Sequence, residues 1–223
     1  MGLHKTIDTI LSIIPYIFEI VGKTNIQVQT TVNPGNGVTD GNGYVSAGFR
    51  CKYNGGAGFV TTFHSSTVGT AISDSSGNTL GDVIVAIHNS YEDFAFVRMY
   101  EIYGNTFSLH PLGNSNYTLS TNYVTTALAQ NYPVRFAGKN TTYVRTGTVY
   151  CFDYSMSTVP SHWILCDYNS YSGDSGGCIF TELNGSYWVI GVHDGRYGDA
   201  TSSHAYGTKF SVMKSCYSSL ILY

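Results

Sequence analysis

Charged side chains are scarce in this chain of 223 residues: Asp, Glu, Lys and Arg together make up 11% of it, against about 25% in an average soluble protein. The formal net charge is −3 and no stretch gathers basic residues, so the electrostatic footprint of a nucleic-acid-binding protein is missing. Most of the surface polarity must therefore come from Ser, Thr, Asn and Tyr. We expect no nucleic-acid partner.

Cysteines are few, odd in number and widely spaced. No Cys-x-x-Cys pair occurs, which argues against a zinc site, and we expect neither a metal nor another cofactor. An odd number leaves at least one thiol free, which argues against a fully disulfide-bonded secreted domain and weakly favours a reducing compartment. Cys151 and Cys166 could pair, but nothing in the sequence requires it. The five cysteines are Cys51, Cys151, Cys166, Cys178 and Cys216.

An uninterrupted apolar run long enough to span a membrane is also absent. The candidate near the N-terminus, HKTIDTILSIIPYIFEIVGK, is too short and is broken by Asp8 and Glu19. Its apolar residues recur at helical spacing, although Pro15 would kink or restart the helix. No small-x-small cleavage site follows, so it is a poor signal peptide. We expect residues 1–24 to form a helical extension packed on the body of the protein, rather than a targeting segment.

From Asn25 onward the sequence alternates short β-rich runs with turn signals such as NPGNG and DGNG. A polar stretch at residues 113–122 divides these runs into two groups and suits a linker. The pattern predicts an all-β protein with two antiparallel barrels or sandwiches, residues 25–112 and residues 123–223.

The segment GDSGG, from Gly173 to Gly177, places a serine within a run of turn residues. One interpretation is an exposed turn between strands. The other is a nucleophile, because a serine hydroxyl becomes reactive when a base takes its proton, an acid orients that base and N–H groups stabilise the oxyanion. Ser175 is then the nucleophile.

A base and an acid are available upstream. His64 is chosen among the seven histidines because it ends the strand-like run GAGFVTTFH, where a side chain can project from a sheet. Asp93 begins the buried run DFAFVRM and is the acid candidate, with Glu92 as its rival.

The segments TTFH, DFAFV and GDSGG, in this order, resemble the chymotrypsin-like serine endopeptidases, in particular their compact bacterial and viral branch. The resemblance runs from about Asn25 to the C-terminus and implies two antiparallel six-stranded β-barrels. It makes Ser175 the nucleophile, His64 the general base and then acid, and Asp93 the group that orients His64. The N–H groups of Gly173 and Ser175 would form the oxyanion hole.

Two neighbouring positions take their interpretation from the same resemblance. Asp174 would be structural, its buried carboxylate held by a charge or by backbone donors. Many relatives carry a disulfide-bonded cysteine directly after the base, whereas this chain has Ser65 there and Cys51 out of register. That disulfide is therefore expected to be absent.

The resemblance also locates the pocket for the residue that precedes the cleaved bond, the P1 residue. Its walls would be the residues before the nucleophile and the strand VIGVHDGRYG. Asn169 stands where an aspartate would select Lys or Arg, which disfavours that specificity. The pocket residues predicted in this way are Asn169, Ser170, Ser172, His193, Asp194, Gly195 and Arg196.

His193 carries the specificity prediction. A Gly-Val-His strand is similar to glutamyl endopeptidases and to viral main proteases that cut after Glu or Gln, and a histidine can donate to a carboxylate or amide oxygen. The alternative is an ordinary core histidine, and His204 could stand behind it. Asp194 departs from the family pattern, and repulsion from Asp93 would have to be relieved by Arg196 or by a raised pKa. Arg196 could instead face an acidic P1 residue.

The sequence therefore predicts a serine endopeptidase that acts on peptide or protein substrates, after Glu or Gln. A viral polyprotein-processing protease inside a host cell fits the odd cysteine count. The alternatives are a secreted bacterial-type protease that prefers small apolar P1 residues, and a protease-fold module that only binds or acts as a toxin. The oligomeric state cannot be read from the sequence.

Overall fold

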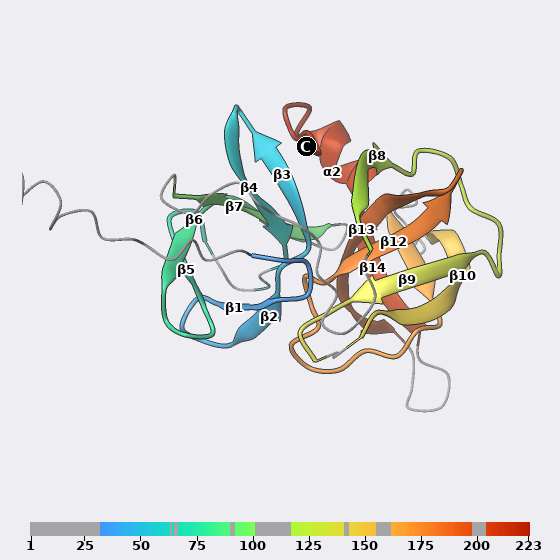
Figure 1. The fold of residues 1–223 in the computed structure, drawn as a ribbon, viewed down its shortest axis with the longest axis horizontal. Coiled ribbons are helices and arrows are strands. Elements are labelled where there is room, and N and C mark those ends of the chain that lie inside the picture. Colours follow the sequence, from blue (N-terminus) through green and yellow to red (C-terminus); the bar gives the residue numbers. More distant parts are fainter. Residues whose placement is uncertain are drawn as a thin grey trace, which may run out of the picture. The chain divides into compact units, whose positions relative to one another are not determined.

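The β-rich runs of the sequence form strands in the computed structural model, which describes residues 32–62, 64, 67–89, 92–100, 117–140, 143–154, 162–197 and 204–223 (Figure 1). These residues belong to one unit, Thr31–Tyr223. The predicted helical extension, residues 1–24, lies outside the described residues, as does the first part of the predicted linker. No helix in the described part is long and apolar enough to cross a membrane.

The first sheet contains seven antiparallel strands in the order β2-β1-β5-β6-β7-β4-β3. Its own core includes Leu80 and Val83 of β6, both fully buried. The strands are β1 (Gly37–Thr39), β2 (Tyr44–Ser46), β3 (Phe49–Tyr53), β4 (Gly56–Thr61), β5 (Ala71–Asp74), β6 (Thr79–His88) and β7 (Asp93–Met99).

The second sheet closes on itself. Its order is β12-β9-β10-β11-β14-β13-β8, and an additional pairing of β12 with β13 completes a six-stranded antiparallel barrel. β8 lies outside this ring and runs parallel to β13. The strands are β8 (Leu119–Tyr123), β9 (Pro133–Ala137), β10 (Arg145–Tyr154), β11 (Trp163–Cys166), β12 (Cys178–Leu183), β13 (Ser186–Tyr197) and β14 (His204–Lys209).

The all-β, two-barrel prediction is thus confirmed, with one difference in detail. Within the described residues the first sheet stays an open half-barrel, since its end strands β2 and β3 do not pair with each other. β1 and β2 contain only three residues each, so this end of the sheet offers few backbone hydrogen bonds for closure.

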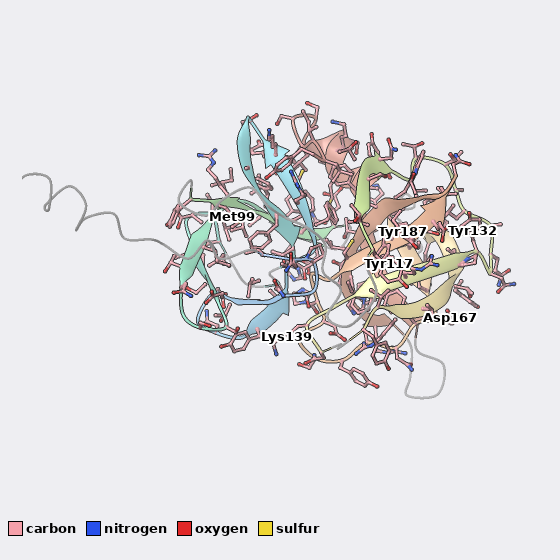
Figure 2. All side chains as sticks on the ribbon, in the orientation of Figure 1. Met99, Tyr117, Tyr132, Lys139, Asp167 and Tyr187 are labelled. Atoms are coloured by element: carbon pink, nitrogen blue, oxygen red, sulfur yellow. The ribbon has the colours of Figure 1, made fainter. Side chains whose placement is uncertain are left out.

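Aromatic side chains cover the outer strand of the second sheet. Tyr117, just before β8, meets Tyr187 of β13 edge to face, with ring centroids 4.9 Å apart (Figure 2). The guanidinium of Arg135 lies over the Tyr187 ring at 5.2 Å. These contacts anchor β8, which has a backbone partner on one side only.

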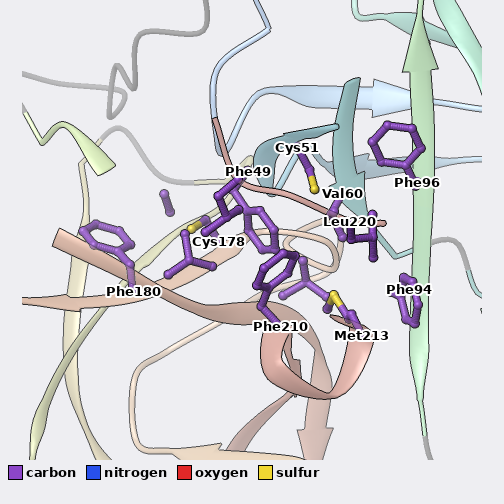
Figure 3. Packing of buried hydrophobic residues seen from close by; sticks show 14 of the residues in the cluster. Phe49, Cys51, Val60, Phe94, Phe96, Cys178, Phe180, Phe210, Met213 and Leu220 are labelled. Atoms are coloured by element: carbon purple, nitrogen blue, oxygen red, sulfur yellow. The ribbon is translucent and has the colours of Figure 1, made fainter. Parts of the chain in front are cut away.

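One apolar cluster joins residues of both sheets to the C-terminal segment (Figure 3). The helix α2 (Phe210–Cys216) contributes Phe210 and Met213, both fully buried. The Phe210 ring lies 5.3 Å from that of Phe49 on β3 and 5.0 Å from that of Tyr123 on β8. One side chain of the helix therefore contacts both sheets.

Replacing Phe210 by alanine should lower the free energy of unfolding by about 3–5 kcal/mol, because it removes a buried ring from this cluster. Urea unfolding measures the loss. Ile221→Ala serves as the control, since that side chain is 56% exposed and its loss should change stability by no more than about 0.5 kcal/mol. Equal losses for the two variants would contradict the role given to Phe210.

Candidate active site

The GDSGG segment forms a tight loop between β11 and β12. Gly173 and Gly176 have φ angles of +91° and +86°, which side chains with a Cβ rarely adopt. A Cβ on Gly176 would also lie 2.2 Å from the carbonyl oxygen of Ser46 and 2.2 Å from Thr61 Oγ1. The loop is thus pressed against the first sheet, and Ser46 N–H donates to the carbonyl of Ser175 at 2.7 Å.

Asp174 holds the loop from the inside. Its fully buried carboxylate accepts from Arg145 Nη1 at 2.8 Å and from the N–H groups of Asn140 and Tyr171 at 2.9 and 2.8 Å. The structural role predicted for Asp174 is therefore correct. Sequence reasoning missed Arg145, which starts β10 and also donates to the carbonyl of Asn169 at 2.7 Å.

His64 and Asp93 come together as the sequence predicts. Asp93 starts β7 and is 3% exposed, and its Oδ2 is hydrogen bonded to Nδ1 of His64, which follows β4. This hydrogen bond raises the pKa of His64 above that of an ordinary histidine, although partial burial opposes the shift. The carboxylate of the rival acid, Glu92, is paired elsewhere: its Oε1 lies 3.3 Å from His162 Nδ1.

A second histidine shares the same carboxylate. His88 ends β6 as the cross-strand neighbour of Asp93, and its Nδ1 lies 3.1 Å from Asp93 Oδ2. Sequence reasoning missed this contact, although His88 is five residues from Asp93 and the hairpin register between β6 and β7 places them opposite each other.

Among the described residues, His64, His88 and Asp93 form the group whose donor atoms could bind a metal ion, lying within 4.8 Å of one another. However, His64 Nδ1 and Asp93 Oδ2 are directly hydrogen bonded. A zinc ion between them would sit roughly 2.0–2.2 Å from each atom and would push them apart. The arrangement therefore fits an oriented histidine better than a metal centre.

Ser175 projects from the loop with its backbone donors available. Its Oγ donates to the carbonyl of Asp194 at 3.0 Å rather than to His64. Hydrogen bonds between catalytic groups are often absent before substrate binds. In the described part of the chain, the N–H groups of Gly173 and Ser175 donate to no protein acceptor. An oxyanion could accept from both.

The predicted pocket wall before Ser175 offers one unusual hydroxyl. Ser170 is 6% exposed, yet its buried Oγ has no hydrogen-bond partner in the described part of the chain. Asn169 and Ser172 are exposed and are held by their backbone carbonyls, which accept from Arg145 and from the Asn140 side chain. Among the described residues, the Ser170 hydroxyl thus lacks the partner that buried hydroxyls usually have.

His193 lies on β13, 2% exposed, directly behind the loop. Its backbone exchanges hydrogen bonds with Gly176 and Gly177 at 2.7 and 2.8 Å. Its Nδ1 lies 3.1 Å from the hydroxyl of the buried Tyr168, and its ring meets the edge of Phe136 at 5.1 Å. Burial lowers the pKa of His193 to about 3, so the imidazole stays neutral at neutral pH.

The other residues predicted on this strand take different positions. Arg196 is exposed, and its Nη1 donates to the carbonyl of Tyr168 at 3.3 Å. Gly195 lies opposite Tyr206 of β14. The structure brings the Asp194 carboxyl to Thr208 Oγ1, at 2.8 Å, instead of bringing it to the pocket wall.

Two further sequence expectations can be compared with the structure. His204 does not stand behind His193: it pairs with Tyr197 in the β13–β14 register and its ring stacks on Tyr150, 3.9 Å away. All five cysteines are free thiols, so Cys151 and Cys166 are not bonded to each other.

Comparisons with known proteins agree at the level of the fold. No protein-family model and no curated protein matches the sequence. Solved structures do match: a glutamic acid-specific serine protease, whose substrate binding uses a histidine triad, is 23% identical with a TM-score of 0.70, over 86% of this chain and 100% of that one.

Two further solved structures give the same result. Nocardiopsis protease is 23% identical with a TM-score of 0.65, over 87% of this chain and 100% of its own. Cellulomonas bogoriensis chymotrypsin is 22% identical with a TM-score of 0.64, over 87% and 99%. The chain thus has the two-barrel fold of the compact bacterial chymotrypsin-like serine proteases.

Replacing Asp174 by alanine should destabilise the protein by about 3–5 kcal/mol, because it leaves the buried guanidinium of Arg145 without its counter-ion. Chemical denaturation measures the effect. The matched control is Glu182→Ala, which breaks an exposed ion pair with Arg135 and should cost at most about 1 kcal/mol. The assignment fails if Asp174→Ala costs no more than this control.

Proposed function

We propose that the protein is a serine endopeptidase in which Ser175, His64 and Asp93 form the catalytic triad. The single observation that carries the proposal is the hydrogen bond from His64 Nδ1 to the buried Asp93. It orients the imidazole of His64, while the glycine-rich loop supplies Ser175 together with the N–H groups of Gly173 and Ser175, which have no protein acceptor among the described residues.

The reaction follows from these groups. His64 Nε2 takes the proton of Ser175 while Oγ attacks the peptide carbonyl carbon, and the carbonyl oxygen becomes an oxyanion that accepts from the N–H groups of Gly173 and Ser175. The imidazolium, stabilised by Asp93, returns the proton to the leaving amine as the C–N bond breaks. A water molecule then gives its proton to His64 and hydrolyses the acyl-serine, which releases the new carboxyl terminus and restores Ser175.

We further propose that the P1 residue is Glu or Gln. The Tyr168 hydroxyl is buried, and its hydrogen-bond partner is His193 Nδ1. Burial raises the pKa of Tyr168 well above its ordinary value, so this hydroxyl keeps its proton and donates it to Nδ1. A neutral imidazole that accepts at Nδ1 carries its own proton at Nε2. This N–H, together with the Ser170 hydroxyl, suits the side-chain oxygen of Glu or Gln.

The free thiols support a reducing compartment. This is compatible with a protease that processes a viral polyprotein inside a host cell, which we prefer to a secreted enzyme. A pocket for small apolar P1 residues would leave the Ser170 hydroxyl and the His193 N–H without a function, and a module that only binds would have no need of an oriented His64.

Cleavage of peptides with Glu or Gln at P1 should fall by about 10⁴-fold or more in Ser175→Ala, with unchanged thermal unfolding. Ser215→Ala, an exposed serine on α2, is the control and should retain full activity. Because His64 must be neutral to accept the proton and its pKa is raised, kcat/KM should fall as the pH drops through a pKa above 6.5. Turnover that survives Ser175→Ala would refute the assignment.

Two substitutions separate the contributions to P1 recognition. Tyr168→Phe removes the hydroxyl that fixes the His193 tautomer and should lower cleavage after Glu and after Gln alike, about tenfold. Arg196→Ala removes a positive charge and should lower cleavage after Glu more than after Gln. Cleavage of a peptide library by each variant and by the wild type gives two ratios, the variant activity relative to wild type after Glu and the same quantity after Gln.

The exposed Arg98 of β7 supplies the control for charge, since Arg98→Ala should leave the two ratios unchanged. Because the pKa of His193 is about 3, the preference for Glu or Gln over apolar residues should stay constant from about pH 6 to 9. A preference for small apolar P1 residues would overturn the pocket assignment while leaving the triad intact.

A further inference from the structure

Asp194 is a buried acid that the proposed mechanism does not use. Its side chain is 2% exposed, and its Oδ2 accepts a hydrogen bond from Thr208 Oγ1 at 2.8 Å. Within the described part of the chain, Asp194 forms no ion pair. An ionised carboxylate without a counter-ion is very costly to bury. Asp194 therefore needs either a cation, which it lacks, or a proton.

The same threonine connects Asp194 to the triad. Thr208 Oγ1 accepts from the N–H of Asp93 at 3.1 Å while its proton goes to Asp194. The backbone of one aspartate and the carboxyl of the other thus meet at a single hydroxyl. On each of the two residues, Oδ1 is buried and has no hydrogen-bond partner among the residues that the structure describes. One shared proton would satisfy both oxygens, because a protonated carboxyl is a donor and a carboxylate an acceptor.

We propose that Asp194 is a positioning residue, which keeps its proton in the folded enzyme and donates it from Oδ1 to Oδ1 of Asp93. The hydrogen bond fixes the Asp93 carboxylate while its Oδ2 orients His64. The pair then carries one negative charge, which is the charge that the mechanism requires opposite the imidazolium. This inference rests on the proposed function for its catalytic meaning, but the shared proton itself does not.

The surroundings of Asp194 favour the protonated form. Burial, and then the charge of Asp93 on β7, raise the pKa of Asp194 well above the usual range of aspartate. The titratable groups facing it from other elements are Tyr206 on β14 and Tyr168 after β11, and the pKa of each is raised mainly by burial, so both are neutral. On its own strand, His193 is neutral and Arg196 donates to the carbonyl of Tyr168.

The backbone of Asp194 also touches the nucleophile, since its carbonyl accepts from Ser175 Oγ at 3.0 Å. The residue thus contacts the serine through its main chain, and its side chain shares the Thr208 hydroxyl with the N–H of Asp93. Asparagine at this position would keep both roles, because its amide donates to Asp93 and its carbonyl accepts from Thr208. Alanine would leave Asp93 Oδ1 without a donor and the Thr208 hydroxyl proton without its acceptor.

The protonation of Asp194 is tested first in the inactive Ser175→Ala protein, where catalysis plays no part. When burial raises the pKa of an aspartate in the folded state, the protein becomes less stable as the pH rises above the pKa of that residue in the unfolded chain, about 3.9. Asp194→Asn does not titrate, so its melting temperature should exceed that of the parent by a few degrees at pH 7.5 and by nothing near pH 4. A melting temperature lowered at pH 7.5 would mean that Asp194 is ionised and compensated, and would overturn the proposal.

Infrared spectroscopy of the same proteins detects the proton directly. With ¹³C-labelled aspartate at neutral pH, Ser175→Ala should show the carbonyl band of a protonated carboxylic acid, shifted by the label. The band should disappear in Ser175→Ala/Asp194→Asn. Absence of the band in the parent, or its persistence in the double variant, would overturn the assignment of the proton to this pair.

Kinetics of the otherwise intact enzyme then test positioning. Asp194→Ala should lower kcat by about 10- to 100-fold with little change in KM, because Asp93 acts on the chemical step through His64. Asp194→Asn should recover most of that loss. Equal losses in the two variants would refute positioning by a hydrogen bond. If the wild-type chain cleaves no peptide, the proposed function fails, and the stability and infrared results still decide whether the proton is shared.

Discussion

The buried ion pair between Asp174 and Arg145 is the interaction on which the geometry of the site depends. It ties the loop that carries Ser175 to the start of β10, and it ties down Asn140 and Asn169 with it. The loop itself has two glycines with positive φ and would relax if this carboxylate released it. An interior charge pair of this kind contributes little net stability, but removing either partner is costly. It therefore specifies one loop conformation.

Three aspartates lie buried around the site, and each has a different electrostatic environment. Asp174 has a guanidinium. Asp93 has the imidazoles of His64 and His88. Asp194 has no charged partner among the described residues, and its carboxyl accepts hydrogen bonds from the hydroxyl and the N–H of Thr208. The three environments come from different strands of both sheets, so the charge distribution of the site exists only when the two sheets are folded together.

The fold, and the residues proposed to react, could be named from the sequence because they depend on local signals. Strand alternation indicated the β-rich runs, and the family resemblance carried by TTFH, DFAFV and GDSGG indicated His64, Asp93 and Ser175. Interaction partners that depend on strand pairing or on long sequence separation could not be predicted. The cation for Asp174 is 29 residues away in sequence, and His88 faces Asp93 only through the pairing of β6 with β7. His204 was misplaced because the β13–β14 register pairs His193 with Gly207 and His204 with Tyr197.

The burial of the thiols has a practical consequence for measuring motion in this molecule. Cys51 lies on β3 of the first sheet, whereas Cys166 and Cys178 lie on β11 and β12 of the second, and all three are fully buried. Burial raises the pKa of each thiol, that of Cys51 to about 12, so none of them reacts while its strand stays closed. Alkylation rates at these positions therefore report the local opening of each sheet separately, with the exposed Cys216 as the fast internal reference.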